Sequence, residues 1–112
     1  MASNKRSWIG FDLDGTLAVD TPLRKDDTVI GQPIPVVTAI ARQFIAEGKD
    51  VRIFTARAYH MNEATKQAIE DWCELHLGKV LPIQAHKDSE LLYFFDDRAQ
   101  CVNGSYFQKT ET

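Results

Sequence analysis

The feature that most constrains the fold of this chain is a short apolar run that ends in two closely spaced carboxylates. Residues 8–11 (WIGF) favour a strand, and Asp12, Asp14 and Gly15 follow directly. An apolar run bounded by a glycine-containing turn is typical of a buried strand, and ligands of open α/β sheets bind outside the carboxyl ends of the strands. Carboxylates are costly to desolvate unless a cation or hydrogen bonds compensate them. The run therefore predicts either a ligand site at a strand end or a solvated Asp-Gly turn.

Length and composition narrow the class of protein. A chain of 112 residues with 44% hydrophobic and 26% charged residues is typical of one globular domain. The net charge of −3 lacks the basic character of domains that bind long nucleic acids. Cys73 and Cys101 lie far apart without CxxC spacing, which favours a reduced, cytoplasmic protein over a disulfide framework or a zinc site. No apolar run approaches the roughly 18 residues of a membrane span, and residues 1–7 precede no apolar segment typical of a secretory signal.

Strand-like and helix-like segments alternate along the chain. The expected strands cover about residues 7–12, 51–54, 80–85 and 91–95. Helices are expected from Pro35 to the residue before Gly48, and from the capping residue Asn62 to the residue before Gly78. Because Pro82 interrupts the third strand, we expect that strand to begin after the proline or to lie near a sheet edge.

Each predicted helix has one apolar face at helical spacing. These faces consist of Val37, Ile40, Ala41, Phe44 and Ile45 in the first helix, and of Ala64 or Thr65, Ala68, Ile69, Trp72 and Leu75 in the second. Residues 16–33 form a long loop with a short extended piece at 28–30, and a connection of this length is usually functional. A helical turn over 99–102 and a weak edge strand at 106–107 complete the expected elements.

The order β-α-β-α-β-(α)-β predicts a single Rossmann-like α/β domain with about four or five mostly parallel strands and helices on both faces. The domain is expected to cover residues 1–112, with 1–6 and 109–112 flexible. Right-handed crossovers place the carboxyl ends of parallel strands on one side of the sheet. The polar residues at or just past those ends are Asp12, Asp14, Thr55, Lys87, Asp96 and Asp97. We therefore expect these residues to meet on one rim.

This set of side chains suits a divalent cation and an anionic substrate. Mg²⁺ prefers oxygen ligands and keeps water in its shell, which leaves room for a phosphate oxygen. Phosphoryl transfer depends on positioning and on neutralising the transferred group, which the metal, Lys87 and the Thr55 hydroxyl can supply. One carboxylate can act as the nucleophile, and a second can protonate the leaving oxygen and then activate water. The sequence thus favours a Mg²⁺-dependent reaction of a phosphate ester.

Chain order separates two protein families that use such residues. In response-regulator receiver domains an acidic pair follows the first strand, and the phospho-accepting Asp follows the third. Here the DLDGT motif (12–16) comes first, the adjacent acids (96–97) come last, and Thr55 and Lys87 lie between them. This order resembles the haloacid dehalogenase superfamily of phosphatases over essentially the whole chain.

The resemblance implies a role for each matching residue. Asp12 is similar to the family's nucleophile and metal ligand, and Asp14 to its general acid/base, whose backbone carbonyl also binds the metal. Thr55 would donate a hydrogen bond to a phosphoryl oxygen. Lys87 would neutralise the phosphoryl group. Lys79 is a weaker candidate for the same role, and Lys87 can alternatively be an ordinary surface lysine. The implied reaction is Mg²⁺-dependent hydrolysis of a phosphate monoester through an aspartyl-phosphate.

The remaining matches concern the metal shell and the substrate. Asp96 and Asp97 would complete the Mg²⁺ shell. Because neighbouring strand residues point to opposite faces, we expect one of them to bind the ion and the other to support the binding residues. The sequence does not decide which one binds directly. Thr16, Arg57 and Arg98 are placed to contact substrate, although both arginines can instead form salt bridges on the rim.

The family's usual cap domain is missing, which bears on the substrate. Neither the 16–33 loop nor the 58–86 segment is long enough for a globular insert, so the chain resembles the minimal, capless type with an open site. An open site suits a bulky phosphorylated partner or closure by a neighbouring subunit, and the oligomeric state stays open. Residues 53–57 (IFTAR) and 96–100 (DDRAQ) also resemble the phosphatase domain of phage-type polynucleotide kinases. The expected partner is therefore a phosphorylated small molecule or a nucleic-acid 3′-phosphate, and a non-catalytic phosphate-binding or receiver-like module is the further alternative.

Overall fold

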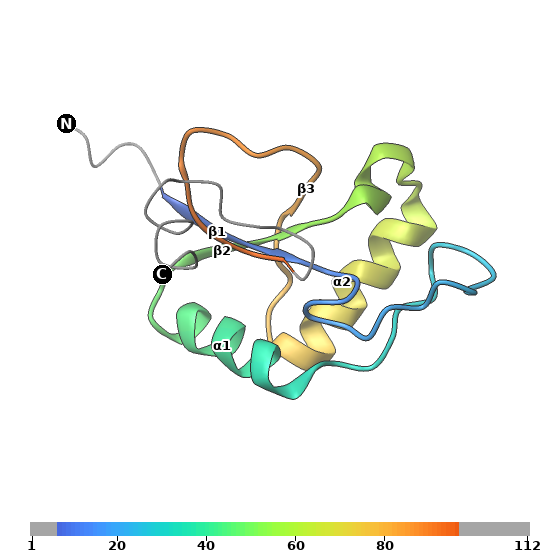
Figure 1. The fold of residues 1–112 in the computed structure, drawn as a ribbon, viewed down its shortest axis with the longest axis horizontal. Helices are drawn as coiled ribbons and strands as arrows, with labels where there is room; N and C mark the ends of the chain where they lie inside the picture. Colours follow the sequence, from blue (N-terminus) through green and yellow to red (C-terminus); the bar gives the residue numbers. More distant parts are fainter. Residues whose placement is uncertain (1–6, 97–112) are drawn as a thin grey trace, which may run out of the picture.

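The computed structural model describes residues 7–96, which form a parallel four-stranded sheet and two α-helices (Figure 1). The elements are β1 (Trp8–Asp12), α1 (Pro35–Ala46), β2 (Asp50–Phe54), the short 3₁₀ helix η2 (Ala56–His60), α2 (Glu63–Leu77), β3 (Ile83–Gln84) and β4 (Leu91–Phe95). The strand order is β3-β2-β1-β4, and all pairs are parallel. This architecture confirms the predicted Rossmann-like α/β fold. The predictions on residues 1–6, 97–112 and their side chains, including Asp97 and Arg98, lie outside the described residues.

Local capping signals set the ends of both helices. Pro35 occupies the first turn of α1, where its missing N–H is not needed. The Asn62 side chain accepts a hydrogen bond of 2.8 Å from the Thr65 N–H and caps α2. Gly78 ends α2 with φ of 79°, a left-handed conformation that glycine adopts without steric cost. Within residues 7–96, neither helix is long and apolar enough to cross a lipid bilayer.

Both helices pack on one face of the sheet, and the prediction of helices on both faces is wrong for the described part of the chain. Side chains alternate between faces along a strand, so Phe11 and its register partner Ile53 share the face that carries the core. Ala41 of α1 and Ile69 of α2 belong to the same buried cluster, and Figure 1 shows both helices on that side. The chain steps from β1 to β2 to β3 in one direction, so right-handed connections lie over the same face.

Two predicted core positions face solvent. Leu75 on α2 is 77% exposed, and Ile40 on α1 is also exposed. The buried residues of α2 are Thr65, Ile69, Trp72, Cys73 and Leu77. This stripe differs from the predicted face because α2 lies beside α1 on the same face of the sheet and contacts both. The expected extended piece at 28–30 is a turn followed by irregular structure.

The opposite face of the sheet is crossed by residues 85–90, which connect β3 to β4 on the other side of β1. The buried Trp8 donates from its indole Nε1 to Oδ1 of Asp88 at 2.6 Å, and its backbone N–H donates to the Glu90 carbonyl at 2.9 Å. The indole hydrogen bond lowers the pKa of the Asp88 carboxyl. Gly10 lies beneath this connection, where a Cβ atom would come within 2.8 Å of the Trp8 ring and 3.1 Å of the Phe94 ring. The crossover is therefore fixed over this face.

The long loop after β1 is closed at its base. Gly15 turns the chain with φ of 86°, which favours glycine. Ala18 forms isolated bridges with Asp14 and with Pro33, which brings the two ends of the loop together. At Gly31 a Cβ atom would lie 2.0 Å from the Val19 carbonyl oxygen, so a glycine is required for this close approach. The loop thus returns to α1 beside the carboxyl end of β1.

Candidate active site

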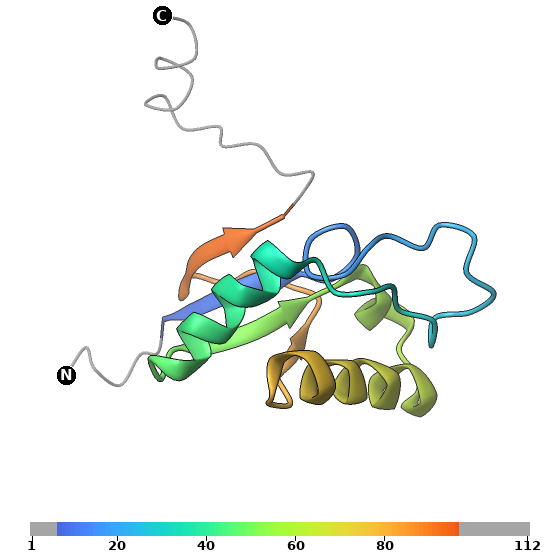
Figure 2. The ribbon, with the colours of Figure 1, turned by 90° about the horizontal axis from the view of Figure 1, so that it is seen from below.

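The candidate site lies at the carboxyl ends of three neighbouring strands. Asp12 ends β1 and pairs with Phe54 of β2, so Thr55 follows directly on the neighbouring strand. On the other side of β1, Phe11 pairs with Phe95, and Asp96 follows β4. Figure 2 shows these strands pointing toward the end of the sheet where the loop after β1 and η2 lie. The chain passes from β1 to β2 on one side, and β4 is added on the other side of β1, so the strand order changes direction at β1. The carboxyl ends of the strands at such a point are the usual place for a ligand in an open α/β sheet.

Asp12 is the central acid of this arrangement. Its side chain is half-buried, and the buried Thr16 hydroxyl donates to its Oδ2 at 3.5 Å. A cavity of about 240 Å³ lies beside this turn and is lined by Gly15, Thr16, Val37, Phe95 and Asp96. The cavity joins Thr16 and Asp96, and its Val37 and Phe95 walls, which pack against the core, place it on the helix-bearing face of the sheet.

Asp14 is held by a buried arginine from the neighbouring strand end. Arg57 is only 4% exposed and donates from Nε to Asp14 Oδ2 at 3.0 Å and from Nη2 to Oδ1 at 2.6 Å. Its Nη1 donates to the carbonyls of Asp27 at 2.7 Å and Val29 at 2.9 Å. The geometry therefore favours the ion pair over direct substrate contact for Arg57. The same bonds tie the carboxyl ends of β1 and β2 to the loop after β1.

Thr55 lies at the floor of the site and is 1% exposed. Its hydroxyl accepts from the Arg57 N–H at 3.1 Å and caps η2, while its own N–H donates to the Gln84 carbonyl at 3.0 Å. A hydroxyl that accepts one bond still has a proton to donate.

Lys87 is held over an aromatic pair on the face toward which strand alternation directs Asp12. Its Nζ lies 4.1 Å from the centre of the Phe94 ring and 5.4 Å from that of Phe54. These two rings meet edge to face with centroids 5.1 Å apart, across the space left open by Gly10. Cations are attracted to the faces of aromatic rings, so the pair fixes a charge beside the end of β1. The sequence did not single out either phenylalanine, since each reads only as a strand residue.

The described residues offer part of a Mg²⁺ shell. The carboxylates of Asp12 and Asp96 flank the end of β1, and the backbone carbonyl of Asp14 follows the same strand. Oxygen donors of this kind, few in number and completed by water and a substrate phosphate, are what Mg²⁺ takes in proteins. Within residues 7–96, no group of three or more carboxylate, imidazole or thiol side chains gathers tightly enough to hold a metal. The available donors are thus oxygen atoms, as Mg²⁺ prefers. The Asp14 carboxylate is not counted among them because both of its oxygens bind Arg57.

Comparisons with known proteins support the fold. No protein-family model and no curated protein matches the chain. A solved structure, that of a conserved protein from Bacteroides thetaiotaomicron, is similar with a TM-score of 0.59 and 19% identity, covering 96% of this chain and 93% of that one. At this identity the likeness concerns the fold alone, and it agrees with the Rossmann-like α/β architecture described above.

Proposed function

We propose that the protein is a Mg²⁺-dependent phosphatase of the haloacid dehalogenase type that hydrolyses a phosphate monoester through an aspartyl-phosphate on Asp12. The observation that carries the proposal is the strand order β2-β1-β4, which sets Asp12 between Thr55 and Asp96. The Thr16 hydroxyl donates to the Asp12 carboxylate, and Lys87 lies over the Phe94 ring on the face toward which strand alternation directs Asp12. A solvated Asp-Gly turn would not require this convergence.

The proposed reaction has two steps. The Asp12 carboxylate attacks phosphorus, the bond between phosphorus and the ester oxygen breaks, and Asp14 gives its proton to the leaving alcohol. Asp14 then takes a proton from water, which attacks the aspartyl-phosphate and releases inorganic phosphate with Asp12 regenerated. Lys87, Thr55 and Thr16 hold the phosphoryl oxygens during both steps. A bound Mg²⁺ would neutralise charge on the transferred group.

Arg57 is a positioning residue in this mechanism. Its fork fixes both oxygens of Asp14, and each carboxylate oxygen still has a lone pair directed away from the guanidinium. The acid can therefore exchange a proton with the substrate without leaving its partner. The proposed substrate is a phosphorylated small molecule. A reducing, cytoplasmic setting suits the buried free thiol of Cys73.

The test is turnover of p-nitrophenyl phosphate with Mg²⁺, with excess chelator and with Ca²⁺. We expect chelation to abolish turnover and Ca²⁺ to substitute poorly, because its larger and more flexible shell misplaces the nucleophile. Asp12→Asn should abolish turnover, whereas Asp71→Asn, an exposed acid on α2 bonded to Gln67, should leave it unchanged. Near-normal turnover by Asp12→Asn would remove Asp12 as the nucleophile.

Asp14→Asn should fail differently from Asp12→Asn. It removes the proton shuttle, a loss of roughly 10²–10⁴-fold, but leaves a nucleophile able to attack a substrate with a good leaving group. The phosphorylated enzyme should then accumulate and be trapped by acid quench. Circular dichroism of the variant must show the native fold, because Asp14 also balances the buried Arg57. Absence of any trapped phosphate on a folded variant with this residual activity would contradict the two-step mechanism.

A further inference from the structure

Two exposed aromatic rings, which we term the rim pair, lie just past the carboxyl ends of β2 and β3. Tyr59 of η2 is 61% exposed, and its ring meets that of His86, also exposed, edge to face with centroids 5.8 Å apart. The Tyr59 hydroxyl donates to the Ala85 carbonyl at 3.4 Å, and the His86 carbonyl accepts from the Gln84 side chain at 3.1 Å. These contacts hold the rim pair in place while much of the Tyr59 ring stays open to solvent. Such a surface suits a planar ligand.

The rim pair lies in line with the candidate nucleophile. Asp12 of β1 is in register with Phe54 of β2, and Phe54 is in register with Gln84 of β3. Register partners on neighbouring strands share one face of the sheet, and the strands are about 4.8 Å apart. Gln84 therefore lies about 10 Å from Asp12, and His86 follows Gln84 by two residues. The base of a nucleotide is one sugar ring away from its phosphate, which is a span of the same order.

The rim pair belongs to the same two segments as two residues of the candidate site. Thr55 caps η2, and Tyr59 follows it by four residues in that helix. His86 directly precedes Lys87 in the connection from β3 to β4. Figure 1 shows η2 and this connection on the same side of the sheet. A phosphoryl group held by Thr55 and Lys87 therefore has aromatic surface within reach of its leaving group.

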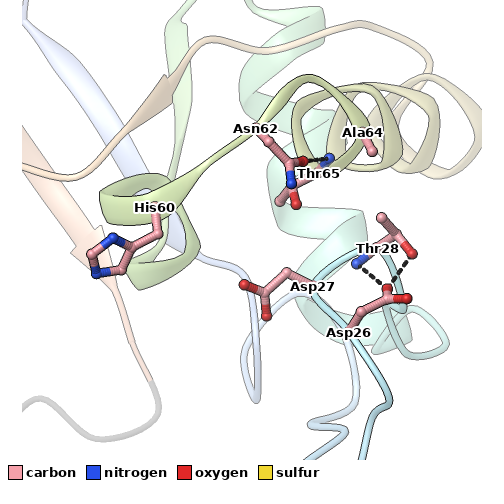
Figure 3. Close-up of a pocket in the computed structure, with 7 residues that line it drawn as sticks. All are labelled: Asp26, Asp27, Thr28, His60, Asn62, Ala64 and Thr65. Carbon is pink, nitrogen blue, oxygen red and sulfur yellow. Dashed lines mark hydrogen bonds between the residues drawn. The ribbon is translucent and has the colours of Figure 1, made fainter.

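The far side of η2 is unfavourable for a phosphorylated compound. A pocket of about 430 Å³ lies there, and Figure 3 shows Asp26 and Asp27 among the residues that line it. Carboxylates repel phosphate. The buried Arg57 also separates this pocket from the site, because its guanidinium binds Asp14 on one side and the Asp27 carbonyl on the other. The ends of β2 and β3, where the rim pair lies, are the more favourable direction for the leaving group.

We propose that the rim pair stacks the base of a nucleoside monophosphate, and that this nucleotide is the phosphate monoester hydrolysed at Asp12. The proposal rests on the phosphatase function proposed above and names its substrate class. Every nucleobase has a π face, so stacking on an aromatic ring accepts purines and pyrimidines alike. The base is held by the rings of Tyr59 and His86, and the phosphoryl group by Lys87 and Thr55.

The charge of the protein favours a single nucleotide over a polynucleotide. Proteins that bind a polynucleotide chain follow its phosphates with lysine and arginine side chains. Here the net charge is −3, and the connection of residues 85–90 carries Asp88 and Glu90 beside its one lysine. A wild-type preference for a 3′-phosphorylated oligonucleotide over a nucleoside monophosphate would overturn this choice of substrate.

The first test isolates the contribution of the base. Adenosine 5′-monophosphate and ribose 5-phosphate carry the same phosphate ester on the same sugar, and the base distinguishes them. We expect kcat/KM of wild type for the nucleotide to exceed that for ribose 5-phosphate by about fivefold or more, which corresponds to one stacked base. Adenosine 3′-monophosphate is assayed in parallel. A kcat/KM for ribose 5-phosphate that equals or exceeds those for both nucleotides overturns the proposal.

The second test removes the exposed ring. Tyr59→Leu keeps an apolar side chain without a π face, so kcat/KM for the preferred nucleotide should fall about fivefold while that for ribose 5-phosphate stays unchanged. Tyr59→Phe keeps the ring and should keep the preference. Tyr93→Leu is the matched control, because Tyr93 is 55% exposed but lies on β4, on the other side of β1. Equal loss on both compounds, no loss on either, or an equal effect of Tyr93→Leu overturns the proposal.

Failure of the two proposals can be distinguished. If wild type hydrolyses p-nitrophenyl phosphate through Asp12 but does not prefer either nucleotide, the phosphatase stands and the rim pair has no part in substrate choice. If wild type hydrolyses no monoester, the phosphatase fails, and base stacking is judged by titrating the protein with adenosine 5′-monophosphate at millimolar concentration and recording amide chemical shifts. Shifts at residues 56–60 and 85–87 that Tyr59→Leu removes support stacking on the rim pair, and their absence overturns it.

Discussion

Replacing Arg57 should destabilise the protein far more than replacing an exposed arginine. The side chain is 4% exposed and serves four acceptors, two on Asp14 and the carbonyls of Asp27 and Val29. Removing one partner of a buried ion pair costs about 3–5 kcal/mol. Because the Asp14 side chain is 23% exposed to solvent, water can solvate it in part. We therefore expect Arg57→Ala to lower the free energy of unfolding by about 3 kcal/mol.

Urea unfolding followed by circular dichroism measures this loss. Arg42→Ala is the matched control, because Arg42 is exposed and donates one hydrogen bond, to the His76 carbonyl at 3.0 Å, so its cost should stay within about 0.5 kcal/mol. Arg57→Lys keeps the charge but not the planar fork, and its cost should fall between the two. An unchanged m value would show that the compactness of both states is preserved.

A double-mutant cycle assigns the loss to the ion pair. Asp14→Asn, Arg57→Ala and the double variant should give a coupling energy of about 2 kcal/mol, near the upper end for residues in direct contact. The loss of unfolding free energy in the double variant should then be clearly smaller than the sum of the single losses. If Arg57→Ala costs no more than Arg42→Ala, or if the coupling is below about 0.5 kcal/mol, the pair does not hold the rim together.

Three further predictions concern single sites. Phe94→Leu removes the nearer ring beneath Lys87. It should lower kcat/KM for p-nitrophenyl phosphate by about two- to fivefold, which corresponds to the energy of an exposed cation–π contact. An unchanged kcat/KM would show that Lys87 does not depend on the ring. The Trp8 indole lowers the pKa of the Asp88 carboxyl, so the stability that this bond adds is present above the unfolded-state pKa and is lost as the pH falls through the lower folded-state pKa. The difference in unfolding free energy between wild type and Asp88→Asn should therefore shrink on acidification below about pH 4, and a constant difference would contradict it. Burial raises the pKa of the Cys73 thiol to about 12, so this thiol should resist iodoacetamide at pH 8 in the native state, and rapid labelling of Cys73, located by mass spectrometry, would show that it is open to solvent.

Elements with a local signal could be predicted from the sequence. Pro35, Asn62 and Gly78 each act through a bond or a dihedral within one or two turns of the chain, and the structure has all three in the predicted roles. Pro82 likewise confines β3 to two residues at the sheet edge. The placement of Asp12 follows from similar reasoning, since an apolar run that ends in acids places those acids at a strand end.

Relations set by tertiary packing could not be predicted in the same way. The face covered by each helix depends on strand order, which periodicity within one segment does not contain. Leu75 satisfies helical spacing but lies outside the stripe that α2 buries against both α1 and the sheet. The role of Arg57 depends on carbonyls of the loop after β1, and a backbone carbonyl leaves no mark in the sequence. The position of Arg57, two residues after Thr55, predicts only that it lies at the carboxyl ends of the strands.

The two candidate lysines lie in different parts of the sheet, a difference that spacing in the sequence does not contain. Lys79 follows α2 and borders a surface hollow with Lys49 and Asp50, where β2 begins, so it lies at the opposite end of the sheet from Asp12. Lys87 instead belongs to the crossover that must pass over the face opposite the helices, because β4 pairs with β1 on the side away from β2. The hydrogen bonds of Trp8 to Asp88 and Glu90 hold that crossover down. A parallel strand added on the far side of β1 thus brings its own connection over that face of the sheet, and places Lys87 of this connection on the Phe94 ring.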